Sequence, residues 1–282
     1  VRILDYHGSD TNVDIPEYLD GKPVIAVQLV NDKCYYRGTK RKNVETVSLP
    51  RTLKVISSYS FEEMSALRSI VIPAGVETIE REAFLDCNAL NSVTFLYGEG
   101  KGLTRIGYAA FKRCTSLTSV KFPDSLKVIE SNAFEDCVSL SEIVLNEGLC
   151  KIEQYAFQYC SALKTLVLPE SIQRLGSSFI RGTKIEKLDI PRNLKSVSYL
   201  LDGTRIKEIV LPPIFSKLTS SILGSSEYLE SLTIEDMGIA KGAISYPKLK
   251  TLIIKGTGVI EENPFFVSVT QHNVTSPGGS YT

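Results

Sequence analysis

Residues 67–89 read LRSIVIPAGVETIEREAFLDCNA, and the same pattern returns twice at the same length. It reappears as LTSVKFPDSLKVIESNAFEDCVS at 117–139 and as LSEIVLNEGLCKIEQYAFQYCSA at 140–162. The three copies share an L-x-x-[IV]-x-[FIL] segment, which is followed by [LV]-x-x-I-x-x-x-A-F-x-x-C. A fixed internal repeat of this length is typical of a solenoid.

Further copies extend the pattern on both sides of this stretch. Residues 44–66 carry Met64 in place of cysteine, and residues 90–116 are lengthened around positions 97–102. After residue 163 the copies loosen, but KTLVLP, EKLDIP, KEIVLP, ESLTIE and KTLIIKG keep the phase of the first segment. In the unit that starts at residue 163, we expect Gly182 to take the place of the cysteine. The sequence therefore predicts about ten units between Val44 and Glu262.

The apolar spacing within one unit predicts its shape. Ile70 and Ile72 are two residues apart, which is the period of a strand, and Pro73 ends that strand because it cannot donate to a ladder. The return limb has a spacing of three to five residues, which favours a short helical turn or an irregular path. One unit cannot bury its own apolar face, so the units must stack. We expect an α/β right-handed curved rod with a parallel β-sheet on its concave face.

The repeat resembles the BspA-like leucine-rich-repeat family, which is found largely in surface proteins of bacteria and some protists. The A-F-x-x-C element carries the resemblance most specifically, and it occurs at 83–87, 110–114, 133–137 and 156–160. The resemblance covers residues 44–256 and touches 13–27. It implies a solenoid that attaches to a cell surface or contacts a host, and it implies no catalytic residues.

The two ends depart from the repeat pattern. We expect residues 1–43 to form an N-terminal cap or a degenerate first repeat, because an open solenoid end exposes a strand edge. Residues 44–262 form the solenoid, and 263–282 form a C-terminal cap with a last strand at 265–269. Residues 276–280 read SPGGS, which suits either a frayed tail or the start of a linker. Residues 1–20 do not resemble a signal peptide, although the chain opens without Met and a leader could have been removed.

Four of the six cysteines recur at one phase of the repeat. They should form a column inside the stack, and no C-x-x-C pair or zinc spacing accompanies them. We expect buried free thiols rather than disulfides or a metal site, with Cys34 and Cys150 out of phase and more reactive. The predicted column consists of Cys87, Cys114, Cys137 and Cys160.

Composition excludes several classes of function. The 32 basic residues balance the 32 acidic ones, so no net charge attracts nucleic acid or an anionic membrane. The two histidines, His7 and His272, lie near opposite ends of the chain, which argues against a Ser-His-Asp or Cys-His site. The glycine-rich run 98–102 lacks the spacing of a phosphate-binding loop and suits a tolerated insertion or a contact loop. We expect no catalytic residue, no cofactor and no metal.

The outward positions of the strands are the main candidate for binding. They are small, polar and mixed in charge, as in solenoids that bind protein ligands, but they lack aromatic anchors. Tyrosines of the return limb, Tyr108, Tyr155 and Tyr159, form a rival surface or simply pack at the rim between units. The candidate residues of the strand face are Arg68, Asn91, Thr94, Thr118, Lys121, Glu142, Lys164, Glu186, Lys187, Lys207 and Glu208.

These observations favour a non-enzymatic recognition or adhesion protein, at the cell surface or secreted, that binds a protein partner as a monomer. Family resemblance supplies the location, and it also supplies the expectation of a host or extracellular-matrix partner. A structural spacer or scaffold that displays another domain is the alternative. That alternative includes an intracellular scaffold, because unpaired thiols suit a reducing compartment.

Overall fold

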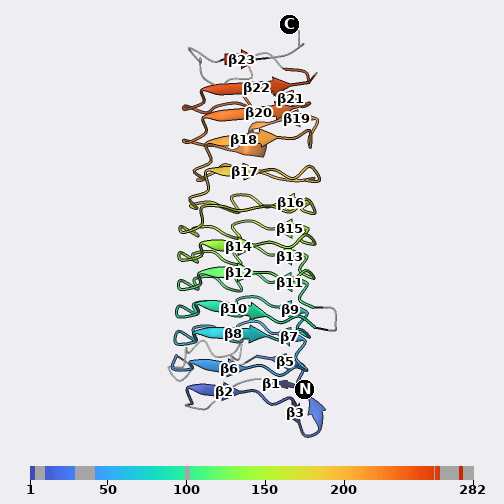
Figure 1. Ribbon diagram of the computed structural model, residues 1–282, viewed down its shortest axis with the longest axis vertical. Helices are drawn as coiled ribbons and strands as arrows, with labels where there is room; N and C mark the ends of the chain where they lie inside the picture. Colours follow the sequence, from blue (N-terminus) through green and yellow to red (C-terminus); the bar gives the residue numbers. More distant parts are fainter. Residues whose placement is uncertain (4–9, 29–41, 99–101, 257, 261–272, 276–282) are drawn as a thin grey trace.

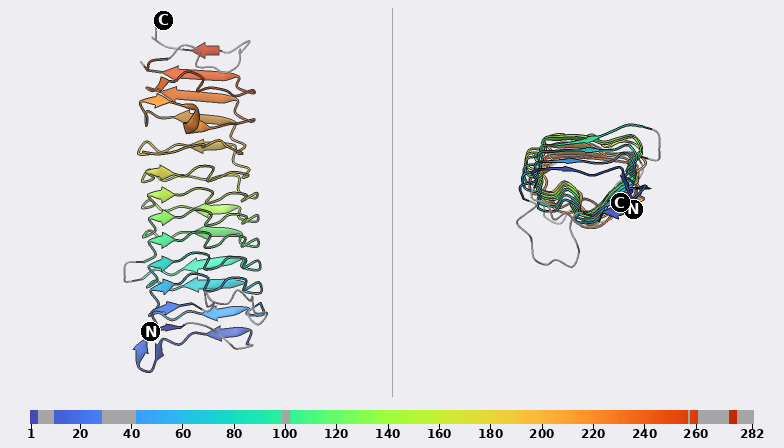
Figure 2. Two further views of the ribbon diagram at one scale, coloured as in Figure 1. Left: turned by 180° about the vertical axis from the view of Figure 1, so that it is seen from behind. Right: turned by 90° about the horizontal axis from the view of Figure 1, so that it is seen from below.

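The computed structural model describes residues 1–3, 10–28, 42–98, 102–256, 258–260 and 273–275. The chain winds into a stack of coils with two rows of short parallel strands along its length (Figure 1). Both side views show a stack that runs with little curvature from β2 to β22, so the strand face is closer to flat than strongly concave (Figure 2). The parallel stacked coils confirm the predicted solenoid.

The first row carries the L-x-x-[IV]-x-[FIL] segments. Its strands form three sheets, β2-β6, β8-β10-β12-β14 and β17-β18-β20-β22-β23. Within each sheet the strands pair in parallel and in register, so that Ser92 lies opposite Ser69, and Glu208 lies opposite Lys187. Every second residue points inward, as the alternating burial of β8 shows. The strands of this row are β2 (Asn12–Asp14), β6 (Thr46–Ser48), β8 (Ser69–Ile72), β10 (Ser92–Phe95), β12 (Ser119–Lys121), β14 (Glu142–Val144), β17 (Lys187–Asp189), β18 (Glu208–Leu211), β20 (Ser231–Glu235), β22 (Thr251–Lys255) and β23 (Asn273–Thr275).

A second row of two-residue strands runs along the return limbs. It holds an eight-stranded parallel sheet in the order β1-β5-β7-β9-β11-β13-β15-β16, and a separate pair, β19 and β21. A short antiparallel hairpin of β3 (Tyr18–Leu19) and β4 (Lys22–Pro23) lies beside the first coil. The strands of the second row are β1 (Arg2–Ile3), β5 (Ala26–Val27), β7 (Val55–Ile56), β9 (Thr78–Ile79), β11 (Arg105–Ile106), β13 (Val128–Ile129), β15 (Lys151–Ile152), β16 (Arg174–Leu175), β19 (Lys217–Leu218) and β21 (Gly238–Ile239).

The return limb is almost free of helix. Within the described residues the one α-helix is α1 (Ser220–Leu223). Left-handed residues recur at two corners of each coil, as at Asn132 (φ 61°) and Asp136 (φ 60°). Such conformations are unfavourable in isolation, but here their N–H groups donate to carbonyls of the next coil. Asn132 N–H bonds Gln154 O at 3.0 Å and Asp136 N–H bonds Gln158 O at 2.9 Å, so stacking rather than a helix satisfies this backbone.

A column of phenylalanine rings runs through the core. The rings of the A-F-x-x-C motifs are fully buried and stack at nearly the spacing of neighbouring strands. The centroids of Phe84 and Phe111 are 4.9 Å apart with an interplanar angle of 3°, and those of Phe111 and Phe134 are 5.1 Å apart. Phe61 and Phe157 extend the column at its two ends. Each ring therefore packs on the coil before it and the coil after it.

The predicted cysteines lie beside this column, and the structure shows them buried and free. Each thiol donates to a main-chain carbonyl of the preceding coil, for example Cys87 Sγ to Phe61 O at 3.0 Å and Cys137 Sγ to Phe111 O at 3.1 Å. Cys114 and Cys160 make the same kind of bond. In these four coils the position holds a small side chain that donates a hydrogen bond, whereas in the first unit it holds the buried Met64.

The assignment of Gly182 to this column is wrong. The main-chain N–H of Asp136, the residue before Cys137, donates to Gln158 O, and Gln158 lies two positions before Cys160. In the same way, the N–H of Tyr159 donates to Arg181 O, and Arg181 lies two positions before Thr183. Thr183 is therefore the counterpart of Cys160, and its hydroxyl donates to Ile180 O at 2.8 Å. Gly182 instead occupies the left-handed corner (φ 74°). The sequence did not reveal this one-residue shift in alignment, because either Phe179 or Ile180 can be matched to the phenylalanine of the A-F-x-x-C motif.

The first row is interrupted at the unit that begins at residue 163. Residues 164–168 do not pair as a strand with either neighbour, and β14 and β17 belong to separate sheets. Leu163, Leu166 and Leu168 are still buried, so apolar packing holds this limb in the stack. The interruption coincides with the coil in which the A-F-x-x-C motif is lost.

The segment 1–43 contributes strands to both rows, since β2 pairs with β6 and β1 pairs with β5. At the other end β23 pairs with β22. The predicted last strand at 265–269, both histidines and Cys34 lie outside the described residues.

Candidate partner-binding face

The outward residues of the first row form one surface, which we call the strand face. All eleven candidate residues named from the sequence lie on it and are exposed. Each of them neighbours a buried residue of the core, and within the strands the outward and inward residues alternate, as with Lys187 and Leu188. The register aligns them in columns across the coils: Ser69, Ser92, Ser119 and Glu142 occupy one position of consecutive strands. Residues more than 70 positions apart in sequence therefore lie along one line.

Charges on the strand face are arranged differently in its two halves. Beyond the interruption, Lys207 Nζ lies 2.8 Å from a carboxylate oxygen of Glu186, and Lys250 pairs in the same way with Glu230 at 2.7 Å. Hydrogen bonding to Lys250 lowers the pKa of Glu230. Lys207 and Glu186 are thus neutralised by each other, which sequence reasoning did not foresee. The lysine and the glutamate stand at the same position of consecutive coils, and this alignment was visible once the repeat was phased.

The other half of the strand face keeps its charges free. Among the described residues, Arg68, Lys121, Glu142 and Lys164 form no ion pair. They are separated by small polar positions such as Asn91, Thr94 and Thr118, which are also exposed. A surface with unpaired charges among short side chains can bind a partner without first breaking internal ion pairs.

Exposed valines add an apolar component that sequence reasoning missed. Val71, Val144 and Val210 stand at one position of the strand face, and their exposed fractions are 47%, 42% and 37%. Val167 occupies the matching place in the interrupted unit and is 82% exposed. Strand propensity alone favours β-branched residues here, so the valines show that the face is partly apolar but do not locate a site.

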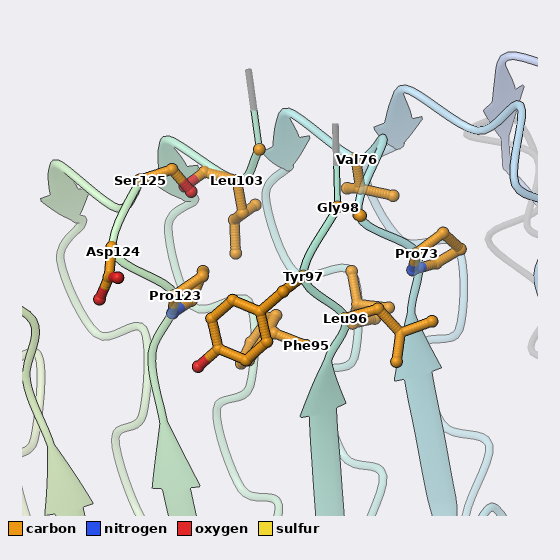
Figure 3. Close-up of a pocket in the computed structure, with 13 residues that line it drawn as sticks. Pro73, Val76, Phe95, Leu96, Tyr97, Gly98, Leu103, Pro123, Asp124 and Ser125 are labelled. Atoms are coloured by element: carbon orange, nitrogen blue, oxygen red, sulfur yellow. The ribbon is translucent and has the colours of Figure 1, made fainter. Parts of the chain in front are cut away.

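A small pocket opens at the edge of the strand face, where β8, β10 and β12 end (Figure 3). Residues of the lengthened unit form much of its lining. Leu96 N–H donates to Ile72 O at 2.9 Å, which holds Leu96 at the place where the neighbouring coils have Pro73 and Pro123. Tyr97, Gly98 and Gly102 of the same unit also line the pocket, which has a volume of about 150 Å³. The intervening residues 99–101, part of the predicted insertion or contact loop, lie outside the described residues.

Two of the three tyrosines named on the return limb contact a neighbouring coil. Tyr108 is 38% exposed, and the guanidinium of Arg81 lies 4.7 Å from the centre of its ring. Tyr159 is 41% exposed and covers Gly182, where an added Cβ would come within 2.4 Å of its ring. Tyr155 is half-buried. The rings cover bare backbone or neighbouring side chains, as expected for packing between coils.

The described residues also bear on three other features: metal-ligand groups, membrane-spanning helices and the remaining described cysteine. They contain no group of three or more His, Cys, Asp or Glu side chains placed to hold a metal ion. No helix in the part of the chain that the structure describes is long and apolar enough to cross a membrane. The intermediate exposure of Cys150 distinguishes it from the buried thiol column.

Thiol reactivity should separate Cys150 from the column. Burial raises the pKa of Cys87, Cys114, Cys137 and Cys160 well above the ordinary value, so thiolate is scarce at these sites in the folded protein. In a Cys34→Ser background at about pH 8, we expect one thiol to react rapidly with Ellman's reagent, and all five remaining thiols to react in denaturant. Adding Cys150→Ser should abolish the rapid phase. Rapid reaction of two or more thiols without denaturant would contradict the buried column.

Comparison with known proteins places this geometry in a family. The model of the BspA type leucine-rich repeat region matches residues 28–98 and 98–201, in six copies. The chain belongs to this family. Leucine-rich-repeat solenoids of this kind are generally binding scaffolds rather than enzymes, and the structural neighbours of this BspA-type protein are bacterial leucine-rich-repeat proteins.

Three solved structures illustrate the likeness. A leucine-rich repeat protein from Bacteroides ovatus is 25% identical with a TM-score of 0.64; the match covers 86% of this chain and 63% of that one. This BspA-type chain thus spans less than two thirds of that relative. The T. pallidum leucine-rich repeat protein is 31% identical over 64% of this chain and 80% of its own, with a TM-score of 0.55. A leucine-rich cell surface protein from Faecalibacterium prausnitzii shares the fold at 19% identity, with a TM-score of 0.55 and coverages of 94% and 81%. The comparison with curated proteins gave no match.

Proposed function

We propose that this BspA-type protein is a non-enzymatic recognition protein, displayed at a cell surface or secreted, that binds a protein partner as a monomer. The site is the half of the strand face formed by β6, β8, β10, β12, β14 and the limb at 164–168. The observation that carries the proposal is a contrast in ion pairing among the described residues: ion pairs lie in the other half, although Lys187 and Glu208 are unpaired there, and none lies in this half. Arg68, Lys121 and Lys164 have no charged partner among the described residues, whereas Lys207 and Lys250 are paired.

Physical reasoning supports this half as the binding surface. Exposed charges without internal partners can pair with an incoming protein without disrupting existing ion pairs. The exposed Val71 and Val144 supply apolar area between them, as interface centres require. The BspA-type family adds the location, since its members are largely surface proteins.

Charge reversal on the strand face should abolish partner binding. We expect saturable binding to at least one member of a panel of extracellular-matrix and host-cell surface proteins, measured by biolayer interferometry. The variant Arg68→Glu, Lys121→Glu, Lys164→Glu should bind at least about tenfold more weakly. Each exposed ion pair with the partner contributes about 0.2–1 kcal/mol to binding, and in the variant all three pairs become repulsive.

A matched variant controls for net charge. Lys127→Glu, Arg174→Glu, Lys195→Glu changes the charge by the same amount at exposed positions of the return limb. It should bind as the parent does. Equal loss in both variants would refute recognition through the strand face, and binding that resists both would move the site to the tyrosines or to the pocket edge.

A spacer or scaffold, possibly intracellular, is the second candidate function. It is favoured by the free thiols of the column and by the self-paired charges beyond the interruption. If the purified protein is folded and binds no member of the panel, the spacer or scaffold function is favoured over recognition.

A further inference from the structure

The pocket at the ends of β8, β10 and β12 has the size of one side chain. Its volume is about 150 Å³, whereas sites for drug-sized ligands measure about 300–1,000 Å³. An engineered apolar protein cavity of about 150 Å³ holds benzene. The pocket can therefore hold a leucine or phenylalanine side chain but no larger cofactor.

The inner wall of the pocket is apolar. Ile72, Val76, Phe95 and Leu103 are buried residues of two consecutive coils and line the pocket. Figure 3 shows Pro73 on one side of the opening and Pro123 on the other, with the ring of Tyr97 between them. Such a lining favours an aliphatic or aromatic group and disfavours a charged one.

The rim of the pocket carries exposed groups that suit a protein ligand. Leu96 is 48% exposed and Tyr97 is 66% exposed, and tyrosine is among the residues most enriched at binding hot spots. The rim joins the strand face directly, because Thr94 of β10 precedes Phe95 and lies opposite Val71 of β8. Exposed apolar groups beside a buried apolar pocket are the usual surroundings of an anchor side chain.

Charge specifies the ligand further. Among the described residues that line the pocket, Asp124 is the only charged one, and it is exposed. Its carboxylate forms no hydrogen bond or ion pair with the described residues. Figure 3 shows it at the rim beside Pro123 and Ser125. A cation next to the anchoring side chain would complement it, whereas an anion there would be repelled.

We propose that this pocket is an anchor site for a peptide segment of a protein partner, taking one leucine- or phenylalanine-sized side chain adjacent to a lysine or arginine that pairs with Asp124. The inference rests on the proposed function, because it names the chemistry of the partner at one end of the strand face. It also connects the pocket with the lengthened repeat, since Tyr97, Gly98 and Gly102 line it.

Capped dipeptides provide the probe. We would titrate N-acetyl-Phe-Arg-amide, N-acetyl-Phe-Glu-amide and N-acetyl-Ala-Arg-amide into methyl-labelled protein and follow the methyl resonances of Ile72, Val76 and Leu103 by NMR. The Phe-Arg peptide should give saturable shifts in the millimolar range. The Phe-Glu peptide should bind about threefold more weakly, as one exposed ion pair implies, and the Ala-Arg peptide should leave these methyl groups unchanged.

Three variants sharpen the test. Asp124→Asn should remove the preference for arginine over glutamate, and Tyr97→Ser should weaken binding while leaving the fold intact, since both side chains are exposed. Ala74→Leu should fill the pocket and abolish the shifts. Absence of shifts with the Phe-Arg peptide, equal binding of Phe-Arg and Phe-Glu peptides, or unchanged binding in Tyr97→Ser would overturn the inference. So would concentration-dependent dimerisation that perturbs the same methyl groups, because the occupant would then be a second copy of the chain.

Failure here is distinguishable from failure of the proposed function. The charge-reversed variant of the strand face retains the pocket and Asp124, so it should bind the Phe-Arg peptide as the parent does. If the panel shows face-dependent partner binding but the peptide gives no shifts, the anchor inference fails alone. If the peptide binds and both charge variants lose the partner equally, the strand-face function fails alone.

Discussion

Phe111→Ala is expected to destabilise the solenoid by about 3–5 kcal/mol, the cost of removing a fully buried phenylalanine. Phe111 is 1% exposed and lies at the middle of the ring column, between Phe84 at 4.9 Å and Phe134 at 5.1 Å. Its removal leaves a cavity and breaks two ring contacts at once. Neighbouring coils cannot collapse into the gap, because their backbones are fixed by hydrogen bonds on both sides. Urea denaturation followed by circular dichroism gives the free energy of unfolding.

Tyr18→Ala is the matched control for this loss. Tyr18 is an aromatic residue of β3 that is 56% exposed and lies outside the ring column. We expect this change to cost less than about 1 kcal/mol. The ring column would not be a main source of stability if Phe111→Ala and Tyr18→Ala were equally destabilising.

Gly176→Ala should destabilise the protein by about 3 kcal/mol, at the upper end for overpacking, or prevent folding. An added Cβ would lie 2.1 Å from the main-chain nitrogen of Gln154 and 2.3 Å from the carbonyl carbon of Glu153. Both atoms belong to the backbone of the preceding coil, so no side-chain rotation can relieve the overlap. The coils would have to separate, which would break the hydrogen bond from Gly176 N to Ile152 O. The thermal midpoint and the urea midpoint should both fall.

Gly21→Ala separates steric overlap from backbone strain. Gly21 has a φ of 72°, but nothing lies within 4 Å of its added Cβ. Its replacement should cost only the left-handed conformation, about 1–2 kcal/mol. If Gly176→Ala proved as mild as Gly21→Ala, the close approach of consecutive coils at Gly176 would be refuted.

The strand face was largely predictable and the pocket was not. Arg68, Lys121 and Lys207 were placed on one exposed surface from the spacing of the apolar residues in each repeat, because that spacing is a local property of the chain. The pairing of Lys207 with Glu186 depends on the contact between coils, so it required the register of the stack. The pocket required the position of Leu96 as well. The sequence marked an insertion at 97–102, but it could not say that a cavity would open beside it.

The sequence by itself determined the repeat, the inward residues and the position of the thiol column, because these follow from periodicity and from the need to bury each apolar face. Tertiary structure alone decided the rest. The second row of strands exists because each two-residue segment gains hydrogen bonds from coils above and below, which a single unit cannot offer. The same stacking stabilises the left-handed corners and places Thr183 rather than Gly182 in the column. Contacts between coils decide these features, and no local pattern encodes them.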